Sequence, residues 1–196
     1  MLQKIRKWSD RSHLFLSPCS HDQQPSLQPQ QLQQAIGIGR LGEEAASFIT
    51  RHPARPFFVY LAFNAVHAPL QAPADEIARF DTGHPDRNTR LAMGKRMDDA
   101  IGNVVAKLKR EGLWETTLLF FISDNGGPLP QSANNTPLRG GKHMDYEGGI
   151  RVPFLVCWPA KLKPGESQAV VSSLDILPTA LAAAGVTATT PNGGDV

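Results

Sequence analysis

The chain of 196 residues is predicted to fold as an α/β protein, with a mostly parallel sheet that carries helices on both faces. Three observations support this prediction. Short uninterrupted apolar runs are typical of buried parallel strands. Stretches with helical periodicity lie between these runs, and the two kinds of segment alternate along the chain. Such alternation indicates a largely parallel sheet covered by helices.

The first predicted pair is a helix that begins near Gly42 and a strand at 57–63. Apolar residues recur at helical spacing as far as Ile49. Pro53 and Pro56 follow and bound the helix before the apolar and aromatic strand begins.

A longer helix is predicted after a loop at 75–90. Its apolar residues between 93 and 108 form an i, i+3, i+4 stripe, and Gly112 stands where a helix-ending glycine is expected. Asp98 and Asp99 lie on this helix, but consecutive helical residues point about 100° apart and do not face one site together. We therefore predict that both have a structural role on a solvated or paired face.

The C-terminal part of the chain is predicted to contain strands at 118–122 and 152–158 and a helix at 174–184. Gly185 ends this helix. Cys157 falls inside the second of these strands, where a free cysteine behaves as a small hydrophobic side chain.

The first forty residues form a separate segment, 1–40, of low complexity and without an assigned fold. Seven of the twelve residues from 23 to 34 are glutamine. Such a composition does not build a packed core. A linker and a misassembled coding region both remain open as explanations for this segment.

Charge and composition exclude several kinds of partner. The chain has 20 basic and 18 acidic residues and a formal net charge of +2, which predicts neither nucleic-acid binding nor a membrane-surface role. No apolar run approaches the roughly 20 residues of a membrane span. The two cysteines do not form a disulfide framework, and nothing in the composition predicts an oligomeric state.

Polar residues follow the strand at 118–122 directly. Asp124 and Asn125 come first, and Gly126 and Gly127 allow a tight turn. Ligands bind beyond the carboxyl ends of strands in open α/β sheets, and carboxylate and amide oxygens suit Ca²⁺ or Mg²⁺. The alternative is a turn without a metal, because the same residues are common in turns.

Two further loops carry candidate functional residues. His67 follows the strand at 57–63, although a lone loop histidine is more often structural. Lys142 lies in a loop at 137–153 with paired glycines on both sides of a cationic cluster. Its ammonium group can meet a sulfate or phosphate oxygen, and a solvated basic loop is the alternative.

Taken together, these segments resemble the sulfatase family of the alkaline-phosphatase-like superfamily, enzymes that hydrolyse sulfate esters. The resemblance covers roughly residues 41–196, which correspond to a central and C-terminal portion of a sulfatase catalytic domain. It is carried by four blocks in the family's order and spacing, at 56–73, 118–127, 137–159 and 171–185. It implies an alkaline-phosphatase-like domain that is incomplete at both ends.

The resemblance implies a role for each candidate residue. Asp124 and Asn125 occupy the positions of two calcium ligands, with Mg²⁺ as the other possible ion. Lys142 occupies that of the lysine that holds the sulfate group, and His67 that of a histidine that contacts the sulfate ester. Arg139 and Glu147 lie inside the matching loop without an assigned chemistry.

The chain also departs from the family pattern. The Cys-x-Pro-x-Arg segment, whose cysteine becomes the formylglycine nucleophile, is absent, and Cys19 has neither the following proline nor the arginine. The first metal-binding aspartate pair of the family is absent too. We therefore expect the isolated chain to be inactive.

The resemblance implies a sulfuric ester hydrolase whose substrate is a sulfated small molecule or carbohydrate. Two alternatives remain, a phosphatase or phosphonate hydrolase of the same superfamily and a non-catalytic remnant. Family members of this kind are expected in the periplasm, outside the cell or in lysosomes.

Overall fold

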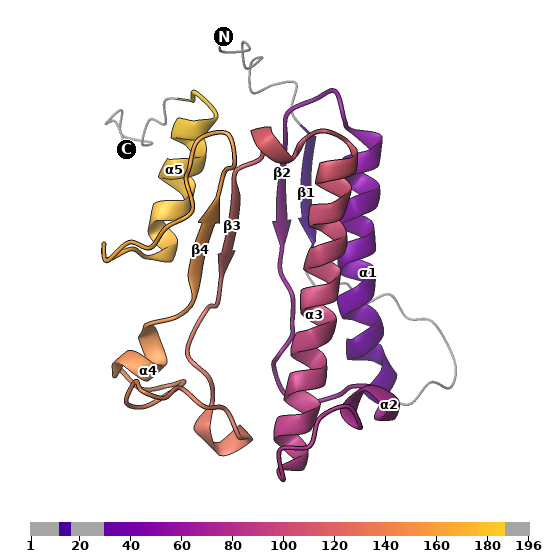
Figure 1. Cartoon of the computed structure of the whole chain (residues 1–196), viewed down its shortest axis with the longest axis vertical. Coiled ribbons are helices and arrows are strands. Elements are labelled where there is room, and N and C mark those ends of the chain that lie inside the picture. Colours follow the sequence, from indigo (N-terminus) through magenta and orange to yellow (C-terminus); the bar gives the residue numbers. More distant parts are fainter. Residues whose placement is uncertain (1–11, 17–29, 187–196) are drawn as a thin grey trace.

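The computed structural model describes residues 12–16 and 30–186, with side chains from residue 37 onward. Figure 1 shows the helices and strands in two groups, with α1, α2, α3, β1 and β2 in one and β3, β4, α4 and α5 in the other. The bounds are β1 (Ser12–Leu16), α1 (Gln30–Arg51), β2 (Phe57–Leu61), α2 (Ala74–Ile77), α3 (Pro85–Arg110), β3 (Leu119–Ile122), α4 (Glu147–Ile150), β4 (Phe154–Cys157) and α5 (Ile176–Ala183).

The apolar core of the described residues lies between α1 and α3, which pack along one another beside β1 and β2 (Figure 1). The predicted apolar stripes supply it. Gly42 permits the close approach, because a Cβ atom there would lie 2.9 Å from the Cβ of Ala100. Every buried hydrophobic side chain of the described part belongs to these two helices: Ile38, Ala45, Phe48, Ile49, Ala92, Met93, Ala100 and Leu108.

One aromatic contact fixes α1 to the neighbouring strand. The ring of Phe48 meets that of Phe57 edge to face, with centroids 6.1 Å apart. Edge-to-face pairs of this kind add to the stability that burial alone gives. The predicted strand at 57–63 begins at Phe57, as expected, but β2 is shorter than predicted and ends at Leu61.

Helix α3 begins earlier than the sequence predicted. The stretch 75–90 was expected to be a loop, but α2 occupies part of it and α3 starts at Pro85. Proline is favoured at the first helical position, and Asp86 complements the positive end of the helix dipole. The first turn is polar, so it lacks the apolar period on which the prediction depended. Helix α1 likewise starts before Gly42, at Gln30.

The two aspartates of α3 lie on a solvated face, as predicted. Both are exposed, and Asp99 forms an ion pair with Lys95 one turn earlier. Pairs at this spacing contribute only a few tenths of a kcal/mol. The C-terminal end of α3 also agrees with the prediction, since Gly112 follows it in the left-handed region at φ 68°.

A mostly parallel sheet is not found within the described residues. Strand β1 pairs with β2 in parallel, and β3 pairs with β4 antiparallel in a separate sheet. A parallel return requires a long crossover, usually a helix. The connection from β3 to β4 contains a 3₁₀ turn (Leu129–Gln131) and the single turn of α4 but no long crossover helix, and β4 returns in the opposite direction. The alternation of predicted strands and helices along the sequence does not distinguish parallel from antiparallel pairing, so the predicted mostly parallel sheet was not correct for β3 and β4.

The second group of elements is far less buried. The predicted strands at 118–122 and 152–158 appear as the shorter β3 and β4, and the predicted helix at 174–184 appears as α5 after a 3₁₀ turn (Ser173–Asp175). No side chain of β3, β4 or α5 is buried. Cys157 is a free, half-buried residue of β4. Among the described residues no helix combines the length and apolar character needed to cross a membrane.

Candidate functional site

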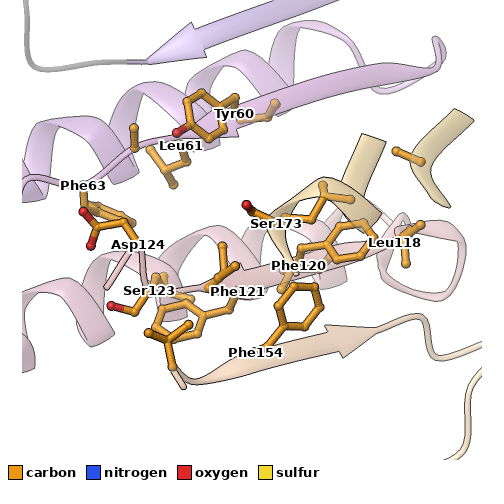
Figure 2. Close-up of a pocket in the computed structure, with 18 of the residues that line it drawn as sticks. Tyr60, Leu61, Phe63, Leu118, Phe120, Phe121, Ser123, Asp124, Phe154 and Ser173 are labelled. Carbon is orange, nitrogen blue, oxygen red and sulfur yellow. The ribbon is translucent and has the colours of Figure 1, made fainter. Parts of the chain in front are cut away.

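A wide groove separates the two groups of elements and contains all four candidate site residues. Its walls are formed by β2 and the loop after it on one side, and by β3 and the loops after it on the other. Figure 2 shows Tyr60 and Leu61 on one side of the groove and Phe120 and Phe121 on the other. His67, Asp124, Asn125 and Lys142 all line this groove. The lining brings together residues from three loops that are distant in the sequence.

Asp124 and Asn125 lie just beyond the end of β3, as predicted. The Nδ2 group of Asn125 donates a hydrogen bond to Oδ1 of Asp124 at 2.8 Å, and the Oγ of Ser123 donates to the carbonyl oxygen of Asn125 at 2.9 Å. These bonds hold the turn. The side chain of Asp124 is exposed toward the groove (Figure 2).

This donor pair fits part of a site for a hard cation. A carboxylate and an amide oxygen are suitable ligands for Ca²⁺ or Mg²⁺, but Ca²⁺ takes six to eight oxygen ligands. Within the described ranges no cluster of three or more histidine, cysteine, aspartate or glutamate residues is arranged to hold a metal. Asp124 and Asn125 therefore supply a partial ligand set.

The loop that carries Lys142 packs directly on the turn after β3. The amide of Gly126 donates to the carbonyl oxygen of Gly149 at 2.8 Å, and the amide of Lys142 donates to that of Gly127 at 3.2 Å. The glycines are necessary for this contact. A Cβ atom on Gly141 would lie 2.5 Å from the carbonyl oxygen of Gly127. The paired glycines thus have a packing role, in that they allow one backbone to approach another.

Asn135 stabilises the same contact, and the sequence analysis did not identify it. Its Oδ1 accepts a bond from the amide of Gly127 at 2.9 Å, and its Nδ2 donates to the carbonyl oxygens of Gly127 at 2.8 Å and Gly140 at 3.1 Å. One side chain therefore connects the glycine pair at 126–127 to the pair at 140–141. Asparagine in a polar loop usually indicates a turn, so the sequence offered no signal for this role.

Lys142 is half-buried, and in the described part of the chain its ammonium group has no ion-pair partner. Three other charged side chains of the loop do have partners. Arg139 stacks over the ring of Tyr146 at 3.8 Å from the centroid, and Glu147 pairs with Arg151 at 3.5 Å. Lys142 is thus left as a cation available to an anion in the groove.

His67 lies in the loop after β2, and its ring is held by the adjacent backbone. Its Nδ1 is 2.7 Å from the carbonyl oxygen of Ala68. A carbonyl only accepts, so Nδ1 carries the proton. The neutral ring therefore presents an unprotonated Nε2, and the imidazolium form presents an Nε2–H donor. The amide of His67 donates to the carbonyl oxygen of Asn64 at 3.0 Å, which closes the turn.

Arg90 joins the His67 loop to the other side of the groove. Its NH1 group donates to the carbonyl oxygen of Val66 at 2.8 Å, and its NH2 group donates to that of Gln131 at 2.9 Å. Burial lowers the pKa of Arg90, and the nearby Asp86 opposes this shift. Arginine nevertheless stays charged. The sequence carries no signal for this role of Arg90, because its partners are main-chain carbonyls.

Comparisons with known proteins identify the family of this chain. The family model described as Sulfatase matches residues 21–186. Steryl-sulfatase of Mus musculus is 40% identical in an alignment of 158 residues that covers 74% of this chain and 24% of that protein. N-acetylgalactosamine-6-O-sulfatase of Bacteroides thetaiotaomicron is 37% identical in an alignment of 145 residues that covers 68% of this chain and 27% of that protein.

Among solved structures, the crystal structure of Ps i-CgsB in complex with a neocarrahexaose matches with a TM-score of 0.74 and 41% identity, over 77% of this chain and 34% of that one. Solved sulfatases of this kind have an alkaline-phosphatase-like fold, and the family uses a formylglycine nucleophile and a divalent metal ion. This chain spans about a quarter of the length of the curated relatives quoted above, so it corresponds to part of their domain. The chain belongs to the sulfatase family.

Proposed function

We propose that this chain is the part of a sulfuric ester hydrolase that supplies several residues of the active site. The observation that carries the proposal is that His67, Asp124, Asn125 and Lys142 all line one groove. Its oxygen donors, ammonium group and imidazole form a set able to receive a sulfate ester.

Each residue has a chemical task in this proposal. Lys142 neutralises negative charge on the sulfate oxygens, a form of preorganised electrostatic stabilisation often worth several kcal/mol. As an imidazolium, His67 orients the ester oxygen through its Nε2–H donor or passes that proton to the leaving alcohol. Asp124 and Asn125 would hold Ca²⁺, or alternatively Mg²⁺, which when bound supplies further positive charge at the sulfate oxygens.

The substrate class proposed is a sulfated carbohydrate or a sulfated small molecule. Support comes from a solved relative that is bound to a neocarrahexaose and from a relative named as an N-acetylgalactosamine-6-O-sulfatase. The nucleophile segment is missing from this sequence, so the 196 residues alone are expected to show no turnover of a chromogenic aryl sulfate with calcium. Turnover above that of a Lys142→Ala variant would contradict this expectation.

Anion binding tests the proposed site without requiring turnover. In a nuclear magnetic resonance titration with sodium sulfate, amide signals of the His67 and Lys142 loops should shift together. Lys142→Ala should weaken the apparent affinity at least about tenfold, since one charge-assisted contact is worth on the order of 1.5–3 kcal/mol. Lys163→Ala is the matched control, because Lys163 is exposed and does not line the groove. Equal losses in both variants would remove Lys142 from the site.

The same titration separates the sulfatase from the phosphatase alternative. Inorganic phosphate replaces sulfate at equal ionic strength, and sulfate should bind more tightly. Tighter binding of phosphate would favour the phosphatase alternative. Absence of any saturable shift with either anion would favour a remnant that keeps only the fold.

Metal binding is tested separately by calorimetric titration with calcium chloride. Asp124→Asn removes the only carboxylate of the proposed pair, and it should abolish whatever saturable heat the unmodified chain gives. Asp98→Asn serves as the control, because Asp98 is exposed on α3 and does not line the groove. Heat that survives Asp124→Asn would place the ion elsewhere.

A further inference from the structure

The turn that carries Lys142 contains a histidine at a position where a glycine is expected. Two non-glycine residues of the described ranges have a positive φ, Ser132 at 59° and His143 at 72°. A side chain disfavours this conformation, and residues that adopt it cluster at functional sites. Ser132 ends the 3₁₀ turn Leu129–Gln131 and does not line the groove. His143 does line the groove, next to Lys142.

His143 occupies the third position of a tight turn. The amide of Met144 donates to the carbonyl oxygen of Gly141 at 3.0 Å, which closes a four-residue turn at 141–144. Lys142, the second residue, has no positive φ, whereas His143, the third, does, and this pattern is that of a type II turn. The third position of such a turn favours glycine, because glycine has no Cβ atom to clash. The imidazole is therefore present at a local cost in stability.

The turn brings two neighbouring residues to the groove. Lys142 and His143 both line it, whereas the next three residues, 144–146, do not. The turn is packed closely at each end. The amide of Lys142 is bonded to the carbonyl oxygen of Gly127, and a Cβ atom on Gly149 would lie only 2.1 Å from the carbonyl oxygen of Met144. This backbone packing restricts the turn and holds His143 beside Lys142 at the groove.

The imidazole of His143 is available to a ligand. It is exposed, and within the described residues it forms no hydrogen bond, ion pair or ring contact. The ring of His67, by contrast, is held by the carbonyl oxygen of Ala68. A neutral imidazole donates one hydrogen bond and accepts another, as a sugar hydroxyl does, whereas the ammonium group of Lys142 only donates. The two neighbours therefore suit different groups of one substrate, Lys142 a sulfate oxygen and His143 a hydroxyl.

We propose that His143 is a specificity-determining residue that binds a hydroxyl group of the sugar to which the sulfate ester is attached. Lys142 holds the sulfate oxygens, and the imidazole of the next residue forms hydrogen bonds with the carbohydrate. This contact selects sulfated carbohydrates over sulfate esters that have no hydroxyl group. The inference rests on the proposed function, because it requires the sulfate to bind at Lys142.

A pair of sulfate esters with the same charge separates the two contacts. Methyl sulfate has the ester group alone, and galactose 6-sulfate adds the hydroxyl groups of the sugar. Each is titrated into the 196-residue chain and followed by nuclear magnetic resonance. His143→Gly and His143→Ala should each weaken the affinity for galactose 6-sulfate about fivefold, on the order of one neutral hydrogen bond. Both variants should bind methyl sulfate as the unmodified chain does.

The two substitutions at His143 separate the imidazole from the backbone. Both remove the ring, but only glycine relieves the positive φ, so a loss shared by both variants comes from the imidazole. A loss in His143→Gly alone would assign the effect to a more mobile loop and overturn the proposal. Ser132→Gly is the matched control, because it relieves the other positive φ outside the groove. It should raise the urea midpoint, as His143→Gly should, and leave both affinities unchanged.

The titrations also distinguish failure of this inference from failure of the proposed function. An unchanged affinity of both His143 variants for galactose 6-sulfate would overturn the role of His143 and leave the sulfate site at Lys142 in place. An equal loss for both esters would show that His143 supports the Lys142 loop or the sulfate itself, and it would also overturn the inference. If the unmodified chain binds neither ester saturably, the proposed function fails and this inference fails with it.

Discussion

The two walls of the groove differ in how their elements are buried. The wall formed by α1, α3, β1 and β2 contains every buried hydrophobic side chain of the described residues, whereas β3, β4 and α5 contain none. Yet the second wall supplies Asp124, Asn125 and Lys142, three of the four candidate site residues. The first wall, which contains the buried core, thus provides stability and His67. The second wall, which has few buried side chains, provides the other three residues of the proposed site.

This difference follows from what each wall packs against. The helices of the first wall bury their apolar stripes on one another. The second wall has no such partner in the described residues, and Leu177 of α5 and Leu155 of β4 are 65% and 56% exposed. Hydrogen bonds between glycine-rich loops hold it instead. We infer that the apolar side chains of the second wall become buried only when additional residues pack over them.

The most destabilising substitution is expected in the core between α1 and α3. Leu108→Ala on α3, where the side chain is only 2% exposed, should reduce the free energy of unfolding by about 2–5 kcal/mol, since it leaves a cavity. The same substitution at Leu155 on β4 should cost less than about 1 kcal/mol, because most of that side chain is already in water. Urea denaturation followed by circular dichroism measures both. Equal costs would mean that β4 is buried in solution by a partner.

A second prediction concerns the glycine contact that holds the second wall. Gly148→Ala should destabilise the Lys142 loop by about 1–3 kcal/mol, because its Cβ would lie 2.7 Å from the carbonyl oxygen of Arg139. Gly165→Ala is the control, with no atom within 4 Å of the added Cβ. Hydrogen exchange across 139–149 should accelerate only in the first variant. Unchanged exchange would show that the loop accommodates the methyl group.

Only part of the fold and of the candidate site could be predicted from the sequence. Apolar periodicity located α1 and α3, because burial of one helix face imposes it directly, and uninterrupted apolar runs located three of the strands. The candidate site was predicted from polar residues at strand ends, and its residue roles stay a prediction. The pairing of β4 with β3 could not be predicted, because main-chain hydrogen bonds carry no side-chain signature.

The same limit applies to Arg90 and Asn135. Both side chains act on backbone atoms of loops, and Arg90 reaches Gln131 in a segment 41 positions away. No residue type marks the receiving carbonyl. The boundary between residues 1–40 and 41–196 stays a prediction, although α1 begins at Gln30 and the family match begins at residue 21. Cys19 lies outside the described residues.

Arg90 provides the third prediction, because it connects the two walls. Arg90→Lys keeps the positive charge. The ammonium group of lysine lacks the planar fork of donors with which arginine reaches the carbonyl oxygens of Val66 and Gln131 at the same time. Loss of these bonds should cost about 1.5–3 kcal/mol, and exchange at both 64–67 and 129–132 should accelerate. Arg79→Lys is the control, because Arg79 is exposed. Acceleration in only one of the two loops would mean that Arg90 does not couple the walls.

The last prediction concerns two glycines of the first wall, Gly102 inside α3 and Gly112 just after it. Both have open space around an added Cβ, so sterics alone would predict equal outcomes. Gly102 lies inside α3, where alanine should stabilise by up to about 1 kcal/mol. Gly112 follows α3 at φ 68°, where alanine should destabilise by about 1 kcal/mol because a side chain disfavours this conformation. Opposite shifts in the urea midpoint with an unchanged slope would show that α3 ends in solution at Gly112; stabilisation by both substitutions would mean that the helix continues past it.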